Sequence, residues 1–249
     1  MQSQVHPEDY DQLIPWKSRL EREIPFLEKV FKEYNVQTVL DTSCGTGRHI
    51  VELAKKGYMV RGIDEDPFMI EKAKNLARNE NLTIMFSVSK CQDISQSIKG
   101  EYDAAICLGD SLALHHKDEI PDCLRELRSN IKKDGIIIIH LRNFKWVRKE
   151  RVRYLPLITR TTENGEIVFV RFFISSNDET EIHLIKLVNN SGFWEMKTHI
   201  SRLTPIYYDE LKDILERVGF RIEKAYGDFK ENPFDQENSP QVIIIAKAV

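Results

Sequence analysis

The stretch Val36-Gln-Thr-Val-Leu-Asp-Thr-Ser-Cys-Gly-Thr-Gly-Arg-His-Ile50 decides the fold of this 249-residue chain. It opens on an apolar run of the kind found in buried strands. Gly45 and Gly47 then bracket a turn in which the backbone approaches another group closely. After a short helical segment, residues 58–63 predict a second strand, and Asp64 stands at its end. The pattern therefore predicts a strand, a glycine turn, a helix and a strand that ends on an acid.

This unit is half of a nucleotide-binding fold, in which ligands bind at the carboxyl ends of the strands. Asp64 follows the glycines at about the spacing of a ribose-binding acid. The dinucleotide fingerprint nevertheless fails, because Ile50 stands where a third small residue is required. Asp41 would repel a phosphate and attract a cation. S-adenosylmethionine (SAM) has a ribose, an ammonium and a sulfonium but no phosphate, so it suits these residues better than a dinucleotide does.

The segment Asp41-Thr-Ser-Cys-Gly-Thr-Gly47, followed by Asp64, resembles motifs I and II of the class I SAM-dependent methyltransferases. The resemblance runs over most of the chain. It implies a Rossmann-like α/β fold, with a seven-stranded sheet of order 3-2-1-4-5-7-6 and an antiparallel β insertion after the fifth strand. It also implies SAM as cofactor and S-adenosylhomocysteine as product. The alternative is a bare βαβ turn that binds no ligand.

The resemblance implies cofactor-binding residues in an N-terminal lid, in the glycine turn, after the second strand and after the third and fourth strands. They are Tyr10, Trp16, Arg19, Asp41, Ser43, Cys44, Gly45, Gly47, Asp64, Glu65, Met69, Gln92, Asp93, Ile94, Leu108 and Gly109. Arg19 is expected to pair with the SAM carboxylate, while Gln92 and Asp93 are expected to recognise the adenine. Simpler roles compete with these, because a tryptophan or methionine often only packs and an aspartate often only caps a turn.

Three segments resemble glycine N-methyltransferase and the glycine/sarcosine N-methyltransferases more closely. They are Ala105-Ile-Cys-Leu-Gly-Asp-Ser111, His140-Leu-Arg-Asn-Phe144 and Tyr226-Gly-Asp-Phe-Lys230. The resemblance implies transfer of a methyl group to the nitrogen of a small amine. It nominates Asp110 and Arg171 as catalytic residues, and it nominates as substrate-binding residues Asp110, Ser111, Asn143, Arg171 and Tyr207.

Two departures from that family concern the acceptor. Asp110 stands where the family has asparagine, and residues 200–202 replace tyrosines. We expect Arg171 to bind the carboxylate of the methyl acceptor. We expect Asp110 to accept a hydrogen bond from the amine of the acceptor and to take the proton of that amine. The repulsion between Asp110 and an acceptor carboxylate at 4 Å is about 1 to 4 kcal/mol, and only a close Arg171 would offset it. We therefore expect weak binding of glycine, and better binding of an acceptor whose amine is cationic or whose carboxylate is missing or more distant. Alternatively, Asp110 only caps the following turn.

Composition bounds the remaining choices. The net charge is −3 with both signs interspersed, which argues against nucleic acid as partner. Apolar runs such as 136–139 are too short for a membrane span, and the N-terminus lacks a secretory pattern, so a cytoplasmic location is expected. The cysteines Cys44, Cys91, Cys107 and Cys123 have no paired spacing and suit reduced thiols. No cluster along the chain has the spacing of metal ligands, so no metal is expected and activity should survive EDTA.

We expect one methyltransferase domain over residues 1–249, with an N-terminal lid and helix over 1–34 and a β-rich insertion over 145–205 that covers the active site. Residues 17–34 predict a helix in which Pro25 causes a kink or a restart, and Asp134 and Gly135 predict a turn before a strand at 136–140. Three strands are predicted in the insertion, at 166–174, 181–188 and 193–203. The cationic segment 145–153 either binds an anion or is a solvated helix or loop. Whether the chain is a monomer or a homo-oligomer is open. Two other functions also stay open: a methyltransferase for another metabolite, a tRNA base or a protein side chain, and a SAM-binding module without catalysis.

Overall fold

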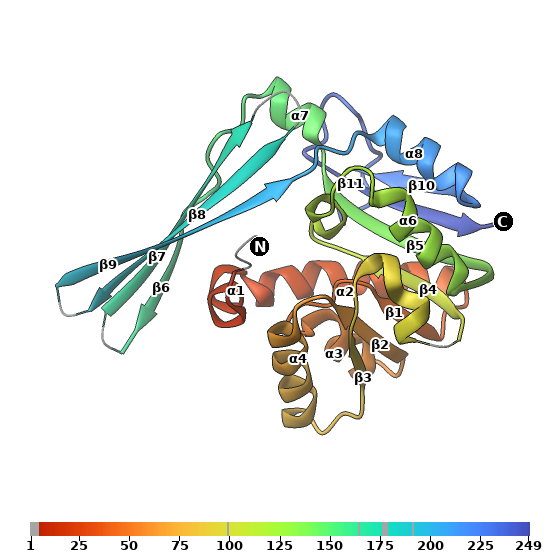
Figure 1. The fold of residues 1–249 in the computed structure, drawn as a ribbon, viewed down its shortest axis with the longest axis horizontal. Coiled ribbons are helices and arrows are strands. Elements are labelled where there is room, and N and C mark those ends of the chain that lie inside the picture. Colours follow the sequence, from red (N-terminus) through yellow and green to blue (C-terminus); the bar gives the residue numbers. More distant parts are fainter. Residues whose placement is uncertain (1–4, 99, 164, 176–178, 191) are drawn as a thin grey trace.

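The computed structural model describes residues 5–98, 100–163, 165–175, 179–190 and 192–249. The chain alternates strands and helices up to residue 149, then forms a run of strands before it returns to the first sheet (Figure 1). The elements are α1 (Pro7–Leu13), α2 (Trp16–Glu33), β1 (Thr38–Asp41), α3 (Arg48–Lys55), β2 (Met59–Asp64), α4 (Pro67–Asn79), β3 (Met85–Val88), η1 (Cys91–Asp93), α5 (Ile94–Ser97), β4 (Tyr102–Cys107), η2 (Ser111–Leu114), α6 (Ile120–Ser129), β5 (Ile131–Arg142), α7 (Phe144–Lys149), β6 (Ile158–Thr162), β7 (Gly165–Ser175), β8 (Thr180–Asn190), β9 (Phe193–Leu203), α8 (Tyr208–Arg217), β10 (Phe220–Tyr226) and β11 (Gln241–Ala248).

The main sheet has seven strands in the order β10-β11-β5-β4-β1-β2-β3. The five strands from β3 to β5 are parallel, and β11 pairs antiparallel with both β5 and β10. If the seven strands of this sheet are numbered by their order along the chain, so that β10 and β11 are the sixth and seventh, they lie side by side in the order 3-2-1-4-5-7-6. This confirms the predicted topology. All the parallel strands therefore present their carboxyl ends at one edge, where the order reverses between β1 and β4.

Alternate isoleucines of β5 face opposite sides of this sheet, since side chains in a strand have a period of two. Ile137 and Ile139 pack under α6 and α8, whereas Ile136 and Ile138 pack under α2. All four are fully buried. Helices thus cover both faces of the sheet, and its carboxyl edge is left to the connecting loops.

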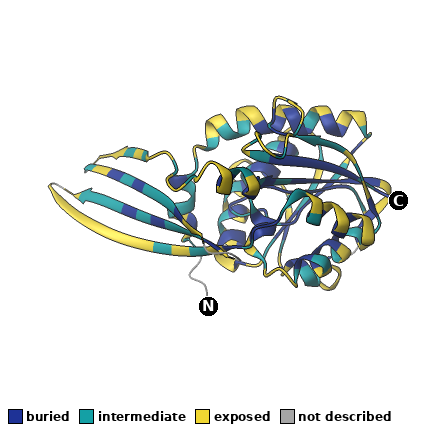
Figure 2. Cartoon of the chain, turned by 90° about the horizontal axis from the view of Figure 1, so that it is seen from above, coloured by how far each residue is buried: buried dark blue, intermediate teal, exposed yellow. Residues whose placement is uncertain are grey.

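The insertion after β5 is a second antiparallel sheet in the order β6-β7-β8-β9. It projects away from the main sheet, with α1 beside the middle part of its strands (Figure 1). Leu13 of α1 packs with Phe169 and Leu184 of the insertion, which holds the N-terminal helix against it. β9 is exposed along most of its length, and Figure 2 shows the insertion as a layer with exposed residues along one edge. The sequence predicted β7, β8 and β9 but missed the short strand β6.

Two local predictions were wrong in whole or in part. The helix does not restart at Pro25, because α2 is continuous through it and its neighbours Ile24, Phe26 and Leu27 are buried against the sheet; a kink there stays a prediction. Asp134 and Gly135 do not precede the fifth strand but lie inside β5, where pairing with β4 jumps between Ile131 and Ile136. Asp134 has a φ of 64° there, which is the conformation of a bulge rather than of a regular strand. No helix in the described ranges is both long and apolar enough to cross a bilayer.

Candidate active site

A cavity of about 650 Å³ lies where the carboxyl edge of the main sheet, the N-terminal helices and the insertion meet. Of the predicted residues, ten line it: Tyr10, Arg19, Ser43, Gly45, Asp64, Glu65, Met69, Gly109, Asp110 and Arg171. The fold therefore brings together residues that are far apart in the sequence. The volume of the cavity is in the range of small-molecule binding sites.

The glycine turn is fixed to the end of β2. The amide of Gly45 donates to Asp64 Oδ2 at 2.8 Å, and the amide of Asp66 donates to Asp64 Oδ1 at 3.0 Å. A carboxylate has about four lone-pair sites, so Asp64 keeps acceptor capacity for a ligand in the cavity. Gly47 has a different role, because a Cβ there would lie 2.8 Å from Ala73 Cβ of α4. The second glycine thus allows α3 and α4 to pack closely.

Two carboxyl groups near this turn are held partly neutral. Burial raises the pKa of Asp41 to about 7, even though the amide of Ser43 donates to it. Burial also raises the pKa of Asp64 to about 6. Both groups would be stabilised as anions by a cation or by hydroxyl donors. A ligand with those groups therefore fits this end of the cavity, and a phosphate does not.

Arg19 is positioned by an acid that the sequence analysis missed. Arg19 Nε lies 3.0 Å from both carboxylate oxygens of Glu23, one helical turn along α2. Burial alone would raise the pKa of Glu23, but His49 and Arg19 lower it to about 2. Burial also lowers the pKa of His49, so neutral His49 donates from Nε2 to the carboxylate at 2.7 Å. The i, i+4 spacing of Arg19 and Glu23 was the available signal.

Gly109 leaves the space in which the Arg19 guanidinium lies. It has a φ of 74°, and a Cβ there would meet Arg19 Nη2 at 2.7 Å. Gly109→Ala is therefore expected to cost about 1–2 kcal/mol in the free energy of unfolding through backbone strain, and also to displace Arg19. Gly57→Ala is the matched control, because Gly57 has a φ of 92° and nothing lies within 4 Å of its missing Cβ. Denaturant unfolding should show a similar loss in the free energy of unfolding for both variants. SAM affinity should fall only for Gly109→Ala. Equal SAM affinity in both variants would contradict the role of Gly109 in leaving space for Arg19.

The N-terminal lid is tied to both sides of the cavity. Asp11 of α1 accepts from Thr46 Oγ1 at 2.7 Å and from Arg48 Nη2 at 2.8 Å. Asp9 of the same helix pairs with Lys186 of β8 at 2.5 Å. The helix α1 therefore joins the glycine turn to the insertion. Tyr10 lies between these two acids, and its ring sits 3.7 Å from the Cβ position of Gly45.

Asp110 forms an ion pair with Arg142 rather than capping the turn. Arg142 donates from Nε at 3.0 Å, from Nη2 at 2.7 Å and from its backbone amide at 2.6 Å to the carboxylate of Asp110. Within the described structure, the side chain of Asp110 makes no capping bond to η2, so the capping alternative was wrong. Burial would raise the pKa of Asp110, but Arg142 holds it below its usual value. The expected proton acceptor is therefore a poor base.

Arg171 reaches the cavity from β7 and is poorly satisfied. Its Nε is buried and has no hydrogen-bond partner among the described residues, and its Nη2 makes only a 3.5 Å contact to the carbonyl of Pro156. Burial and the nearby Arg142 lower the pKa of Arg171. Arg142 itself is occupied by Asp110 and by the face of Phe173 at 4.5 Å. Arg171 is thus a half-buried cation whose Nε is buried and which has no ion-pair partner among the described residues.

Several cavity residues were missed by the sequence analysis. They include Glu23, His140, Arg142, Trp146, Phe173 and Gln241. His140 accepts from the amide of Gly109 at 3.3 Å through Nδ1, and its Nε2 lies 3.0 Å from Gln241 Oε1. His140 and Arg142 both stand at the carboxyl end of β5, in a segment that the family resemblance had marked. Their position at the strand end was the signal that could have found them.

Eleven of the predicted residues are not among the described residues that line the cavity. They are Trp16, Asp41, Cys44, Gly47, Gln92, Asp93, Ile94, Leu108, Ser111, Asn143 and Tyr207. Asn143 caps α7 with its carbonyl and donates to the carbonyls of Gln236 and Ser239 at 2.8 Å. Trp16 donates to Asp11 at 3.0 Å, and Ser111 contacts Cys107 Sγ at 3.2 Å. Burial raises the pKa of Cys44 well above its usual value, which makes its thiol inert.

The remaining predicted residues outside the lining lie in the turns beside it. Gln92 donates to Glu119 at 3.4 Å, and Asp93 accepts from Gln96 at 3.0 Å. Ile94 and Leu108 are buried in the core. Tyr207 lies just before α8 and faces Arg148 at 5.7 Å. Any contact of these residues with a ligand stays a prediction.

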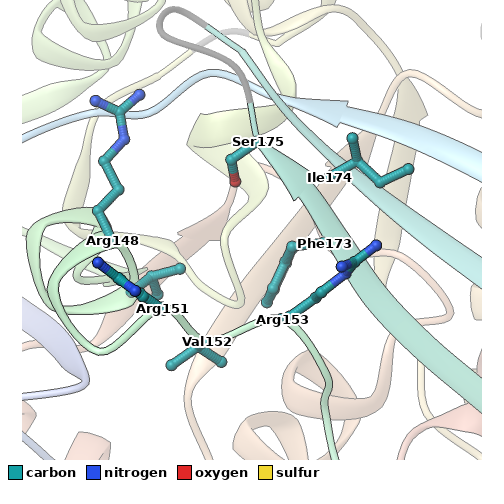
Figure 3. A pocket seen from close by; sticks show the side chains of 8 residues that line it. Arg148, Arg151, Val152, Arg153, Phe173, Ile174 and Ser175 are labelled. Atoms are coloured by element: carbon teal, nitrogen blue, oxygen red, sulfur yellow. The ribbon is translucent and has the colours of Figure 1, made fainter.

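A second pocket, of about 400 Å³, lies behind the cavity wall and contains the cationic segment. Figure 3 shows Arg148 and Arg151 on one side of it and Arg153 beside Phe173 of β7. The nearby Lys145 Nζ pairs with Glu237 at 2.5 Å, so part of the segment is neutralised by the chain itself. Anion binding by this segment stays a prediction.

Comparison with known proteins gives the family. The model described as "Methyltransferase domain" matches residues 39–135. The chain is 28% identical over 248 residues to the glycine/sarcosine N-methyltransferase of Aphanothece halophytica, covering 96% of this chain and 87% of that one. A SAM-dependent methyltransferase from Clostridium acetobutylicum has the same fold, with a TM-score of 0.80 at 15% identity, over 97% of this chain and 96% of that one.

A SAM-bound structure of an amino pentose methyltransferase from Micromonospora echinaspora also has this fold, with a TM-score of 0.73 at 15% identity over 100% of this chain and 98% of that one. The glycine turn, the strand-end Asp64 and the sheet order agree with these matches. The chain is a SAM-dependent methyltransferase with the α/β fold of the class I enzymes.

Proposed function

We propose that this enzyme transfers the methyl group of SAM to the nitrogen of a small amine that also carries a carboxylate, such as glycine or sarcosine. The observation that carries the proposal is Arg171, a half-buried arginine of the cavity whose buried Nε has no partner among the described residues. A cation in that state is stabilised by an anion, and a carboxylate matches the guanidinium fork. The glycine/sarcosine N-methyltransferase of Aphanothece halophytica, similar over nearly the whole chain, supports the same class of acceptor.

The residues of the cavity fit SAM. Asp64 keeps acceptor capacity for the ribose hydroxyls, and Arg19 beside Gly109 offers a guanidinium for the methionine carboxylate. Asp41 lies buried behind the glycine turn and contributes negative potential for a cationic ligand. When bound, SAM supplies an activated methyl group on a sulfonium. The protein therefore has to position the two reactants and exclude water, which can account for roughly 7–11 kcal/mol of a barrier.

The Asp110–Arg142 pair changes the expectation for glycine. Asp110 alone would repel an acceptor carboxylate, but Arg142 neutralises it directly, at 2.7 Å from Nη2. Arg171 then leaves an excess positive charge in this part of the cavity. A carboxylate-bearing amine is therefore favoured, and weak glycine binding is no longer expected on the ground of charge.

The acceptor amine must be neutral when it reacts, and the cavity offers little help with its proton. The low pKa of Asp110 makes it a weak base. Burial lowers the pKa of His140, whose two ring nitrogens already contact Gly109 and Gln241. The cavity therefore selects the deprotonated amine from solution, and Asp110 orients it through a hydrogen bond.

SAM affinity is expected to fall as the pH is lowered below about 7. The pKa of Asp41 is about 7 and that of Asp64 is about 6 in the free enzyme. SAM stabilises the anionic forms, so it lowers both pKa values and its binding releases protons in this pH range. The dissociation constant should rise by up to about tenfold per pH unit for each protonated group and level off above pH 7. Calorimetry in buffers of different ionisation enthalpy tests this, and proton uptake on binding would contradict the assignment.

The proposed acceptor class is tested by a broad screen. The purified enzyme is incubated with labelled SAM and with small amines, unmodified tRNA or peptides in parallel, and the products are identified by mass spectrometry. Methylation of small carboxylate-bearing amines supports the proposal. Methylation confined to tRNA or peptides would replace it with another acceptor. If SAM binds but no acceptor yields S-adenosylhomocysteine, the chain is a binding module without catalysis.

A further inference from the structure

Outside the cavity, three side chains with metal-binding atoms converge. Cys91 Sγ, Cys123 Sγ and a ring nitrogen of His115 all lie within 4.8 Å of one another. They come from three elements: Cys91 opens η1, His115 follows η2, and Cys123 lies on α6. These three residues are not spaced along the chain as in known metal-binding motifs, so the sequence did not predict a metal site. The cavity lining formed by the described residues includes none of the three.

The donor set and its burial suit a zinc ion. Two thiolates and an imidazole are among the commonest zinc ligands, with bonds of about 2.0–2.3 Å. In a tetrahedral site such bonds place ligand atoms roughly 3.3–3.8 Å apart, so side-chain shifts of about 1 Å would close the observed cluster. Cys91 is 5% exposed and Cys123 is 0% exposed, while His115 is half-buried at the surface end. An ion could therefore enter on the histidine side.

The surroundings supply further polar groups. Gln92 Oε1 lies 3.8 Å from Cys123 Sγ, and Gln92 Nε2 donates to Glu119 at 3.4 Å. The backbone next to His115 is also fixed, because Thr204 Oγ1 donates to its carbonyl at 2.7 Å. A partly open tetrahedral site takes its fourth ligand from water or a nearby carboxylate, and Glu119 is the candidate here.

We propose that Cys91, His115 and Cys123 form a binding site for one Zn²⁺ ion. Binding of the ion replaces the two thiol protons, which are released to solvent, and leaves a Zn–thiolate₂–imidazole unit that is neutral with water as fourth ligand and carries one negative charge with Glu119. The ion links the turn after β3 to the segment after β4. It thereby fixes Gln92 and Asp93, the residues nominated for adenine recognition, to α6. The site is structural and takes no part in methyl transfer.

Metal titration of the reduced, metal-stripped full-length enzyme tests the site. We expect one equivalent of Zn²⁺ in competition with a chromophoric chelator, a higher melting temperature with Zn²⁺ but not with Mg²⁺, and thiolate-to-metal charge transfer with tetrahedral d–d bands when Co²⁺ is used. Three variants, Cys91→Ser, Cys123→Ser and His115→Gln, should each weaken Zn²⁺ binding by roughly tenfold or more. Replacing a residue that only hydrogen-bonds to a metal ligand already weakens metal binding by about that factor, so loss of a ligand should cost at least as much.

Two matched controls separate this site from general thiol or histidine binding. Cys107→Ser removes another buried thiol, and His116→Gln removes the adjacent exposed histidine, which pairs with Asp118 at 2.7 Å. Both should keep wild-type affinity within about twofold, as expected for residues that do not bind the ion. The cobalt spectrum of the wild type is informative even if a variant fails to fold. No stoichiometric binding, equal binding in all variants, or a Cys91–Cys123 disulfide with no metal uptake by the reduced enzyme would overturn the proposal.

Discussion

Replacing Arg171 by Met is expected to lower kcat/KM for a carboxylate-bearing amine by about 30-fold or more. Removing one partner of a buried, hydrogen-bonded charge pair costs roughly 2–5 kcal/mol, and the acceptor carboxylate would lose the guanidinium whose buried Nε has no partner among the described residues. Met keeps most of the side-chain volume of Arg, so the loss should come from charge and hydrogen bonds. Steady-state kinetics with glycine or sarcosine measures it, and most of the effect should be in KM.

Two comparisons make this result specific. Arg160→Met removes a half-buried arginine of the same insertion that lies outside the cavity lining and donates from Nη1 to the carbonyl of Thr159 at 2.9 Å, and it should change little. An amine of similar size without a carboxylate should react equally well with wild type and with Arg171→Met. If both acceptors lose activity in parallel, Arg171 supports the fold of the insertion and does not recognise the carboxylate.

Replacing Asp64 by Ala is expected to weaken SAM binding by about ten- to 150-fold. A hydrogen bond to a charged group is worth roughly 1.5–3 kcal/mol, and the change removes the acceptors assigned to the ribose hydroxyls. It also releases the amide of Gly45, which shapes the glycine turn. Calorimetry at pH 8, where the carboxylate is ionised, measures the loss.

Asp66→Ala is the control for this prediction. Asp66 caps α4 by accepting from the amide of Phe68 at 2.8 Å, so its loss costs stability close to the site without removing a cavity acceptor. Losing such a cap costs about 1 kcal/mol. SAM affinity should be nearly unchanged in Asp66→Ala. Equal weakening in both variants would mean that Asp64 acts only through the local fold.

The fold was predictable because local signals and the global topology agree. The glycine turn, the strand-end acid and the buried isoleucines of β5 each required a parallel sheet with a ligand at its carboxyl edge. The boundaries were less predictable: Asp134 and Gly135 read as a turn, yet β5 continues through them as a bulge. A local propensity gives way where a long pairing with a neighbouring strand stabilises the backbone.

Site residues were predictable only where they belong to a single sequence motif. Asp64 and Gly45 follow from spacing, but the pairing of Asp110 with Arg142 depends on how β4 and β5 align. The same holds for Glu23 with His49, which join α2 to the start of α3. Contacts between elements set these roles, and no pattern within a single segment encodes them. The convergence of Cys91, His115 and Cys123 is a further case.

The most direct test of the proposed function is a competition for limiting labelled SAM. Glycine and sarcosine are mixed at equal concentration with amines of similar size that lack a carboxylate, and the methylated products are quantified by mass spectrometry. The account predicts that the label goes mainly to the carboxylate-bearing amines with wild type, and that Arg171→Met removes this preference. Label found mainly on the carboxylate-free amines, or a preference that survives Arg171→Met, would contradict it.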